Sequence, residues 1–183
     1  MTLPFRLELT AAAPSKDLLS IVTLSWNGSH FYLLPSRTTF IEMQSDHQAA
    51  VQETAKELWD FFASRNVSEL LVRRGPGTGP HQASTGSTKF ETILQLLPLT
   101  CPHITVQKVT GWVCKENWLL PLPQSDLSAR AKNLQQQAIQ TAAYGLGCVL
   151  ERAQPTIKPE KLRFRPRICL PEEMKPASRS SWL

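Results

Sequence analysis

Residues 70–97 read LLVRRGPGTGPHQASTGSTKFETILQLL, and the pattern changes twice along this stretch. It opens with a short apolar run (70–73) that is typical of a buried strand, and then passes through a loop rich in glycine and proline. Residues 89–97 have helical spacing, with one apolar face made of Phe90, Ile93, Leu94 and Leu97. Pro98 is expected to end this helix. A strand, a loop and an amphipathic helix in this order predict one β-α unit of an α/β fold.

The segment before this unit has the pattern of an antiparallel meander. Apolar and polar residues alternate at its start, AAAPSK (11–16) is expected to turn the chain, and Asn27-Gly28 is a strong hairpin signal. The expected strands are residues 3–10, 17–26 and 29–35, with 38–43 either continuing the third or forming a short extra strand. The first strand is expected to bury one face, because its leucines alternate with polar residues.

Two more helices and one more strand complete the predicted order. A helix begins after Ser45 or Asp46, either of which is a suitable N-cap, and carries an apolar stripe from Val51 to Phe62. Residues 104–110 alternate as a strand, and 126–151 form the longest helical pattern. The order β-β-β-α-β-α-β-α predicts a mixed five-stranded sheet covered by helices, which is the order of ribonuclease-H-like folds. We expect one domain (1–151) and a C-terminal extension (152–183).

The composition excludes several classes of protein. Its 183 residues, 42% hydrophobic and 19% charged, are typical of one globular domain. No apolar run approaches the roughly 20 residues that span a bilayer, and the N-terminus lacks the pattern of a secretory signal, so a cytoplasmic protein without membrane contact is expected. The cysteines and histidines have neither CxxC nor HxxxH spacing, which argues against zinc and redox sites.

The excess positive charge lies in the C-terminal extension. Residues 1–151 contain 12 Lys or Arg and 12 Asp or Glu, whereas residues 152–183 contain 8 and 3, together with five prolines. Within 158–171, basic residues alternate with apolar ones, and the central basic residues are Lys161, Arg163, Arg165 and Arg167. This pattern suits an added strand that pairs with a protein partner, or contacts along a nucleic-acid backbone; the alternative is a solubilising tail.

Five motifs resemble those of a small bacterial family of unknown function that has a predicted ribonuclease-H-like fold. They are LELT (7–10), WNG (26–28), LLVRRGPGTG (70–79), GSTKFETILQLL (86–97) and NLQQQAIQTAAYGL (133–146). The wider ribonuclease-H-like superfamily includes the Holliday-junction resolvases. The resemblance covers roughly residues 3–150, and it implies a resolvase-like α/β fold for that part of the chain.

The resemblance also implies a site for Mg²⁺ or Mn²⁺. In active members of the superfamily, carboxylates converge at the middle of the sheet and hold two metal ions that act on a phosphodiester. The first-strand position corresponds to Glu8, and the nearest acid after the fourth strand is Glu91. The last helix has Gln136, within a glutamine triplet, where a glutamate is expected. Glu8 and Glu91 are therefore the candidate catalytic residues and metal ligands of a degenerate or weak site, because glutamine offers only a neutral oxygen.

Each of these residues also has a structural interpretation. Glu8 is equally an outward-facing strand residue, and Glu91 is equally a member of the polar face of its helix. Asp17 and Asp126 are substitute ligands only if the fold brings them near.

The glycine-rich loop is a candidate anion site. It contains neither GxxxxGK[ST] nor GxGxxG, so it is not a known nucleotide-binding motif. Gly75, Gly77 and Gly79 allow backbone N–H groups to turn toward an anion, and the N-terminus of the following helix, near Ser87 and Thr88, adds a favourable dipole. A merely connecting segment has the same composition. The basic residues beside the loop are predicted phosphate contacts: Arg73, Arg74 and Lys89.

Three functional hypotheses follow from these patterns. The preferred one is a nucleic-acid-binding ribonuclease-H-like protein with a degenerate metal site. The second is a non-catalytic protein-interaction module that uses the fold as a scaffold and the tail for docking. The third is an active metal-dependent nuclease or resolvase. The sequence leaves the oligomeric state and the choice between DNA and RNA open.

Overall fold

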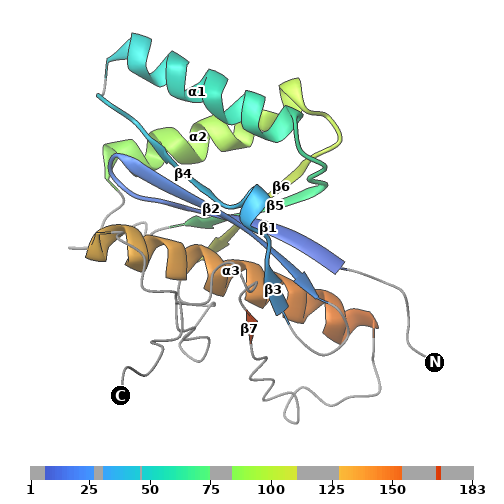
Figure 1. The fold of residues 1–183 in the computed structure, drawn as a ribbon. Coiled ribbons are helices and arrows are strands. Elements are labelled where there is room, and N and C mark those ends of the chain that lie inside the picture. The colour runs from blue at the N-terminus through green and yellow to red at the C-terminus, as the bar shows by residue number, and fades with distance from the viewer. Residues whose placement is uncertain are drawn as a thin grey trace, which may run out of the picture.

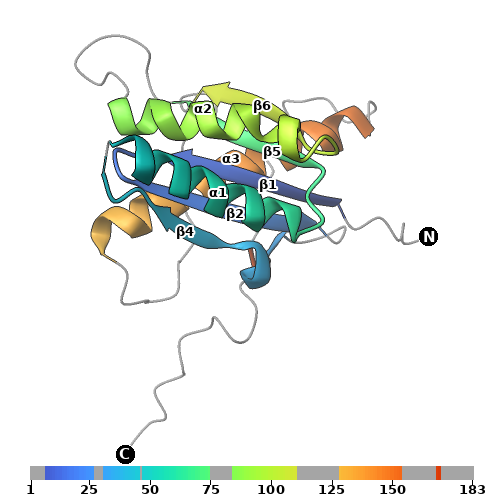
Figure 2. The same ribbon diagram turned by 90° about the horizontal axis from the view of Figure 1, so that it is seen from above.

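A mixed β-sheet lies between two helical layers (Figures 1 and 2). The computed structural model describes residues 7–26, 31–45, 47–74, 84–110, 128–153 and 168–169. One face of the sheet is covered by α1 (Gln48–Ala63) and α2 (Thr85–Thr100), and the other by α3 (Ala129–Ala153). The strands are β1 (Leu7–Pro14), β2 (Leu18–Trp26), β3 (Phe31–Leu33), β4 (Thr39–Glu42), β5 (Glu69–Arg74), β6 (Thr105–Thr110) and β7 (Ile168–Cys169).

The strand order is β6-β5-β1-β2-β3-β7, and β4 also pairs with β2. β2 is antiparallel to β1, β3 and β4, whereas β1, β5 and β6 are parallel to one another. The sheet is an antiparallel meander followed by parallel crossovers, which confirms the mixed sheet predicted from the sequence. The predicted number of strands is too low: a short 3-10 helix (Pro35–Arg37) divides β3 from β4, and two residues of the tail pair with β3 as β7.

The predicted turn at residues 11–16 begins too early. β1 continues through Ala11–Ala13 to Pro14, and these three alanines have no exposed surface. They belong to a strand because β1 is central in the sheet and lies between helices on both faces, where small side chains allow close packing. For the same reason β1 is buried on both faces from Leu9 onward, and the predicted half-buried alternation is wrong there.

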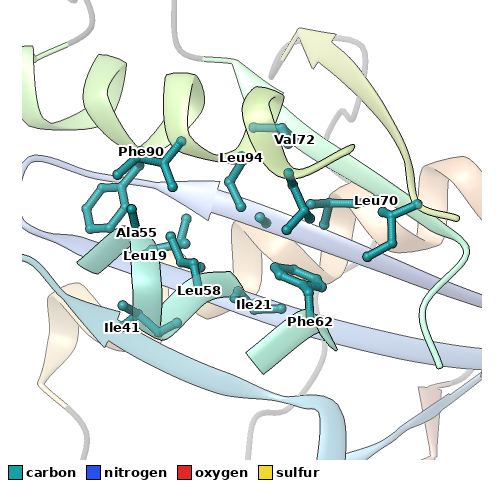
Figure 3. Packing of buried hydrophobic residues seen from close by; sticks show 14 of the residues in the cluster. Leu19, Ile21, Ile41, Ala55, Leu58, Phe62, Leu70, Val72, Phe90 and Leu94 are labelled. Atoms are coloured by element: carbon teal, nitrogen blue, oxygen red, sulfur yellow. The ribbon is translucent and has the colours of Figure 1, made fainter. Parts of the chain in front are cut away.

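The larger core lies between the sheet and the α1–α2 layer (Figure 3). The helices contribute Leu58 and Phe62 from α1 and Phe90 and Leu94 from α2, and none of these four side chains has exposed surface. The apolar stripe predicted for α1 and the face predicted for α2 both point into this core. A side chain of this size stabilises the fold by about 1.5–3 kcal/mol when it is fully buried.

A second core joins α3 to the other face of the sheet. Leu9 of β1 and Leu71 of β5 pack beneath Ala138, Ala142 and other small residues of α3. The approach is closest at Gly145, where an added Cβ would overlap the side chains of Leu9 and Leu71. Helix α3 is therefore held directly against the two central parallel strands.

Two helix ends differ from the sequence-based prediction. The N-cap of α1 is His47 rather than Ser45, and its side chain makes no capping bond; Asp46 lies outside the described residues. Helix α2 starts at Thr85, where Ser84 Oγ accepts a hydrogen bond from the N–H of Ser87. Pro98 does not end α2. It lies in the last turn, and the N–H of Cys101 still donates to the carbonyl of Leu97.

Among the residues described, no helix has the length and apolar character needed to cross a membrane. Cys101 and Cys148 are free thiols, and Cys114 lies outside the described residues.

Candidate functional site

Glu8 forms an ion pair at the amino end of β1. Its Oε2 lies 2.5 Å from Nη1 of Arg37, which also donates to the carbonyl of Asn66 at 3.3 Å. Two residues along the same face of β1, Thr10 shares a hydrogen bond of 2.8 Å with the hydroxyl of Thr23. Side chains alternate between the faces of a strand, and the α1–α2 core includes Ala12, so Glu8 faces the α1–α2 side.

Glu91 is a buried carboxylate on α2. Only 6% of the residue is exposed, and Oε2 lies 3.5 Å from Nζ of Lys108 on β6. Its other oxygen, Oε1, is buried and has no hydrogen-bond partner among the described residues. A half-satisfied buried carboxylate is costly to the fold, so Glu91 is a strained part of the packing rather than a plain member of a solvated helix face.

The structure does not bring Glu8 and Glu91 together. Glu91 is level with Lys108, which is in register with Val72 of β5 and hence with Ala12 of β1. Glu8 is four residues before Ala12 on β1, and β1 and β6 are two strand spacings apart. The two carboxylates are therefore on the order of 15 Å apart. One divalent ion requires oxygen ligands at roughly 2.0–2.6 Å, so a shared metal ion is not compatible with this arrangement.

The α3 side of the sheet is also short of carboxylates. The residues of β1 that face α3 are Leu9, Ala11 and Ala13, all of them apolar. Residues 129–149 of α3 contain no Asp or Glu, and Gln135 of the glutamine triplet is buried. The resemblance implies ligands from the first strand and the last helix, but Glu8 points away from that helix. No cluster of three or more His, Cys, Asp or Glu occurs within the described ranges.

Asp17, the substitute ligand considered above, is paired with a basic side chain. Its carboxylate forms a two-pronged ion pair with the guanidinium of Arg130 at the start of α3, and Arg130 also donates to Ser15 Oγ at 2.9 Å. The hydrogen bond from Arg130 lowers the pKa of Asp17 below its usual value, even though partial burial acts to raise it. Asp126 lies outside the described residues.

Basic side chains from four elements lie at one end of the sheet. Because β1 and β5 are parallel, their carboxyl ends lie together, and Lys16 and Arg74 are exposed there. Arg130 is held at the same end by Asp17. Gly86 places the first turn of α2 against the carbonyl of Lys16, which brings Lys89 to this end as well. We call Lys16, Arg74, Lys89 and Arg130 the basic end of the sheet.

Arg73 has a different role from its neighbour Arg74. Adjacent residues of a strand point to opposite faces, and Arg73 faces α3, where Nη1 donates to the carbonyl of Gln137 and to Oε1 of Gln140, both at 3.3 Å. It ties β5 to α3, so its guanidinium is already engaged by protein. The remaining predicted contacts lie outside the described residues: Gly75, Gly77, Gly79, Lys161, Arg163, Arg165 and Arg167.

Lys16 and Arg130 were not predicted from the sequence. Lys16 stands in what looks like an ordinary turn, and Arg130 is far from it along the chain. Only the packing of α3 antiparallel to β1 places Arg130 beside Ser15 and Asp17. An alternation of basic residues in one segment is visible in a sequence, whereas a cluster assembled from separate elements is not.

Solved structures with the same fold include RuvC. No protein-family model and no curated protein sequence matches this chain. Thermus thermophilus RuvC superimposes with a TM-score of 0.60 at 8% identity, covering 83% of this chain and 99% of that chain. T. thermophilus RuvC in complex with a Holliday junction substrate gives 0.57 at 9% identity, covering 76% and 96%. The chain therefore has the ribonuclease-H-like, resolvase-like fold that its motifs predict.

Proposed function

We propose that this chain is a nucleic-acid-binding protein built on a ribonuclease-H-like fold, with a degenerate metal site. The observation that carries the proposal is the basic end of the sheet. Basic side chains from β5, α2, α3 and the turn after β1 lie beside a helix N-terminus, and one of them, Arg130, is paired with Asp17. In open α/β sheets, ligands bind outside the carboxyl ends of the strands, which is where this cluster lies.

The chemistry of the basic end suits the phosphate backbone. Lysine and arginine side chains neutralise phosphates, and the positive end of the α2 dipole favours an anion at the same place. Such contacts carry little sequence information, so the proposal is backbone recognition rather than base readout. One of the similar RuvC structures holds a Holliday junction, which makes a four-way DNA junction the first probe to use. The basic tail adds further contacts in this proposal.

The described residues do not fit a two-metal nuclease site. Glu8 is engaged by Arg37, Glu91 is buried beside Lys108, and the two are on separate parts of the sheet. The neutral Gln136 stands on α3 where the resemblance implies a glutamate. Mg²⁺ and Mn²⁺ need several hard, charged oxygens in one place, so we derive no hydrolytic step for this chain. Binding without cleavage is the activity that these residues support.

If the protein binds through phosphate contacts, its affinity for the junction depends on salt concentration. The logarithm of the binding constant for a fluorescein-labelled junction, measured by anisotropy, is expected to fall linearly with the logarithm of salt concentration. The double variant Lys16→Ala/Arg74→Ala is expected to reduce that slope by about 2, because two phosphate contacts are lost. Lys56→Ala, which removes an exposed lysine from the middle of α1, serves as the matched control and is expected to leave the slope unchanged. A binding constant that does not change with salt concentration would contradict the proposal. Equal slopes for the double variant and for Lys56→Ala would also contradict it.

A further inference from the structure

A groove of about 620 Å³ runs between α1 and α2 on the outer side of that helical layer. Its floor and walls are mainly apolar, with Val51, Ala55 and Trp59 from α1 facing Ile93 and Leu96 from α2. The apolar surface continues along α2 beyond the groove, because Leu96 is 45% exposed and Leu99 is 80% exposed. These are the exposed large apolar residues of the described part of the chain, and both lie on one helix. An apolar strip of this kind on a helical surface is typical of a docking site.

Trp59 offers the groove the apolar surface of its ring. The indole Nε1 is buried and makes no hydrogen bond to any described residue. Because this nitrogen has no exposed surface, a ligand in the groove would contact the ring and not the N–H. Trp59 therefore favours an apolar group in the groove.

The charges that border the groove directly are positive, and the acidic residues of α1, Glu53, Glu57 and Asp60, do not line it. Lys89 is the only ionisable side chain among its described lining residues, and Lys56 lies on the rim, one helical turn from both Gln52 and Trp59. Both helices run antiparallel to β5, so their N-termini lie at the same end of the groove (Figures 1 and 2). Neither helix has an acidic residue in its first turn to offset the positive end of its dipole. An anionic partner is favoured for these reasons.

We propose that the α1–α2 groove is a docking site for an acidic amphipathic helix of a partner protein. The partner's apolar residues would contact Trp59, Ile93 and Leu96, and its carboxylates would lie toward Lys56, Lys89 and the helix N-termini. On α2, Thr92 and Leu96 line the groove one turn apart, and the exposed Leu99 extends the apolar surface beyond it. Nucleic acid is a poorer fit, because most of this surface is apolar and carries no charge. Lys89 belongs to both the groove and the basic end, so the two sites are distinguished through Leu96, which lines the groove and is not part of the basic end.

The test compares two synthetic, fluorescein-labelled helical peptides by anisotropy. Both have leucine at i, i+3, i+4 and i+7; one has glutamate at the polar positions and the other has lysine. The glutamate peptide is expected to bind saturably, and the lysine peptide at least about tenfold more weakly, because like charges oppose it. Equal binding of the two peptides, or no binding of either, would overturn the proposal.

Two variants locate the binding surface. Leu96→Asp places a negative charge in the groove and is expected to weaken binding of the glutamate peptide at least about tenfold. Gln95→Asp adds the same charge to an exposed position of α2 that does not line the groove, and is expected to bind as the wild type does. Urea unfolding of both variants confirms that α2 is intact. Equal loss in both variants would overturn the assignment.

A second copy of the chain, or nucleic acid, in the groove would give different results in these experiments. A wild-type chain that sediments as a dimer, with Leu96→Asp monomeric, would show that a second copy fills the groove. Competition by the DNA junction, together with loss of junction binding in Leu96→Asp, would show that nucleic acid fills it. Each of these results would replace the proposed peptide partner. The expected result is a monomer whose Leu96→Asp variant binds the junction normally.

Discussion

Replacing Gly86 with alanine is expected to lower the free energy of unfolding by about 3 kcal/mol, the upper end of what overpacking costs. A Cβ at this position would overlap the backbone carbonyl of Lys16. A backbone atom cannot move aside as a flexible side chain can, so either α2 or the turn after β1 must shift. Because this contact also brings Lys89 to the basic end of the sheet, the variant is expected to weaken binding of the junction as well. Urea unfolding and junction anisotropy measure the two effects.

Gly147→Ala is the matched control for this prediction. Gly147 lies inside α3, and an added Cβ there meets nothing within 4 Å. Alanine is more stable than glycine in a helix interior by roughly 0.5–1 kcal/mol, so this variant is expected to be slightly more stable than the wild type. Similar stability of the two variants would contradict the packing of α2 against the turn after β1.

Replacing Lys108 with methionine is expected to destabilise the fold by about 2 kcal/mol, because it leaves the Glu91 carboxylate buried without its counter-ion. The full cost of breaking a buried pair is larger, but the side chain of Lys108 is 34% exposed and water reaches it. Glu91→Met removes the orphaned Oε1 together with the charge and is expected to be neutral or stabilising. Denaturant unfolding of both single variants tests the two expectations.

The double variant separates the ion pair from general effects on packing. With Glu91 already changed to methionine, Lys108→Met is expected to cost under about 0.5 kcal/mol, since no carboxylate remains to be paired. A cost as large as in the wild-type background would show that Lys108 stabilises β6 by another route. Junction binding is expected to be unaffected by Glu91→Met, because Glu91 lies outside the basic end.

The order of elements was predictable because each has a strong local pattern. The run at residues 70–73, the apolar face of 89–97 and the long pattern at 126–151 each matched one observed element. Where the prediction failed, tertiary contacts decided the structure. Ala11–Ala13 has little strand propensity of its own, yet it lies in a strand because helices cover both of its faces.

The candidate site was less predictable than the fold. Glu8 and Glu91 occupy the positions that the resemblance implies, but the face on which a strand residue lies depends on register, and one residue in either direction reverses it. Glu8 faces the α1–α2 side, whereas Gln136, at the position where the resemblance implies a third ligand, lies on α3. Lys16 and Arg130 come together only through the docking of α3, which leaves no local signal in the sequence.

The most direct test of the account compares junction binding and junction cleavage in EDTA and in Mn²⁺. Glu8→Gln is the test variant, and Glu42→Gln, an exposed glutamate of β4, is its control. We predict binding in both buffers, no cleaved product in either, and no difference between either variant and the wild type, because Glu8 is paired with Arg37 and no cluster of carboxylates is present in the described residues. Cleavage that requires Mn²⁺, persists in Glu42→Gln and disappears in Glu8→Gln would contradict it, and would establish an active metal-dependent nuclease.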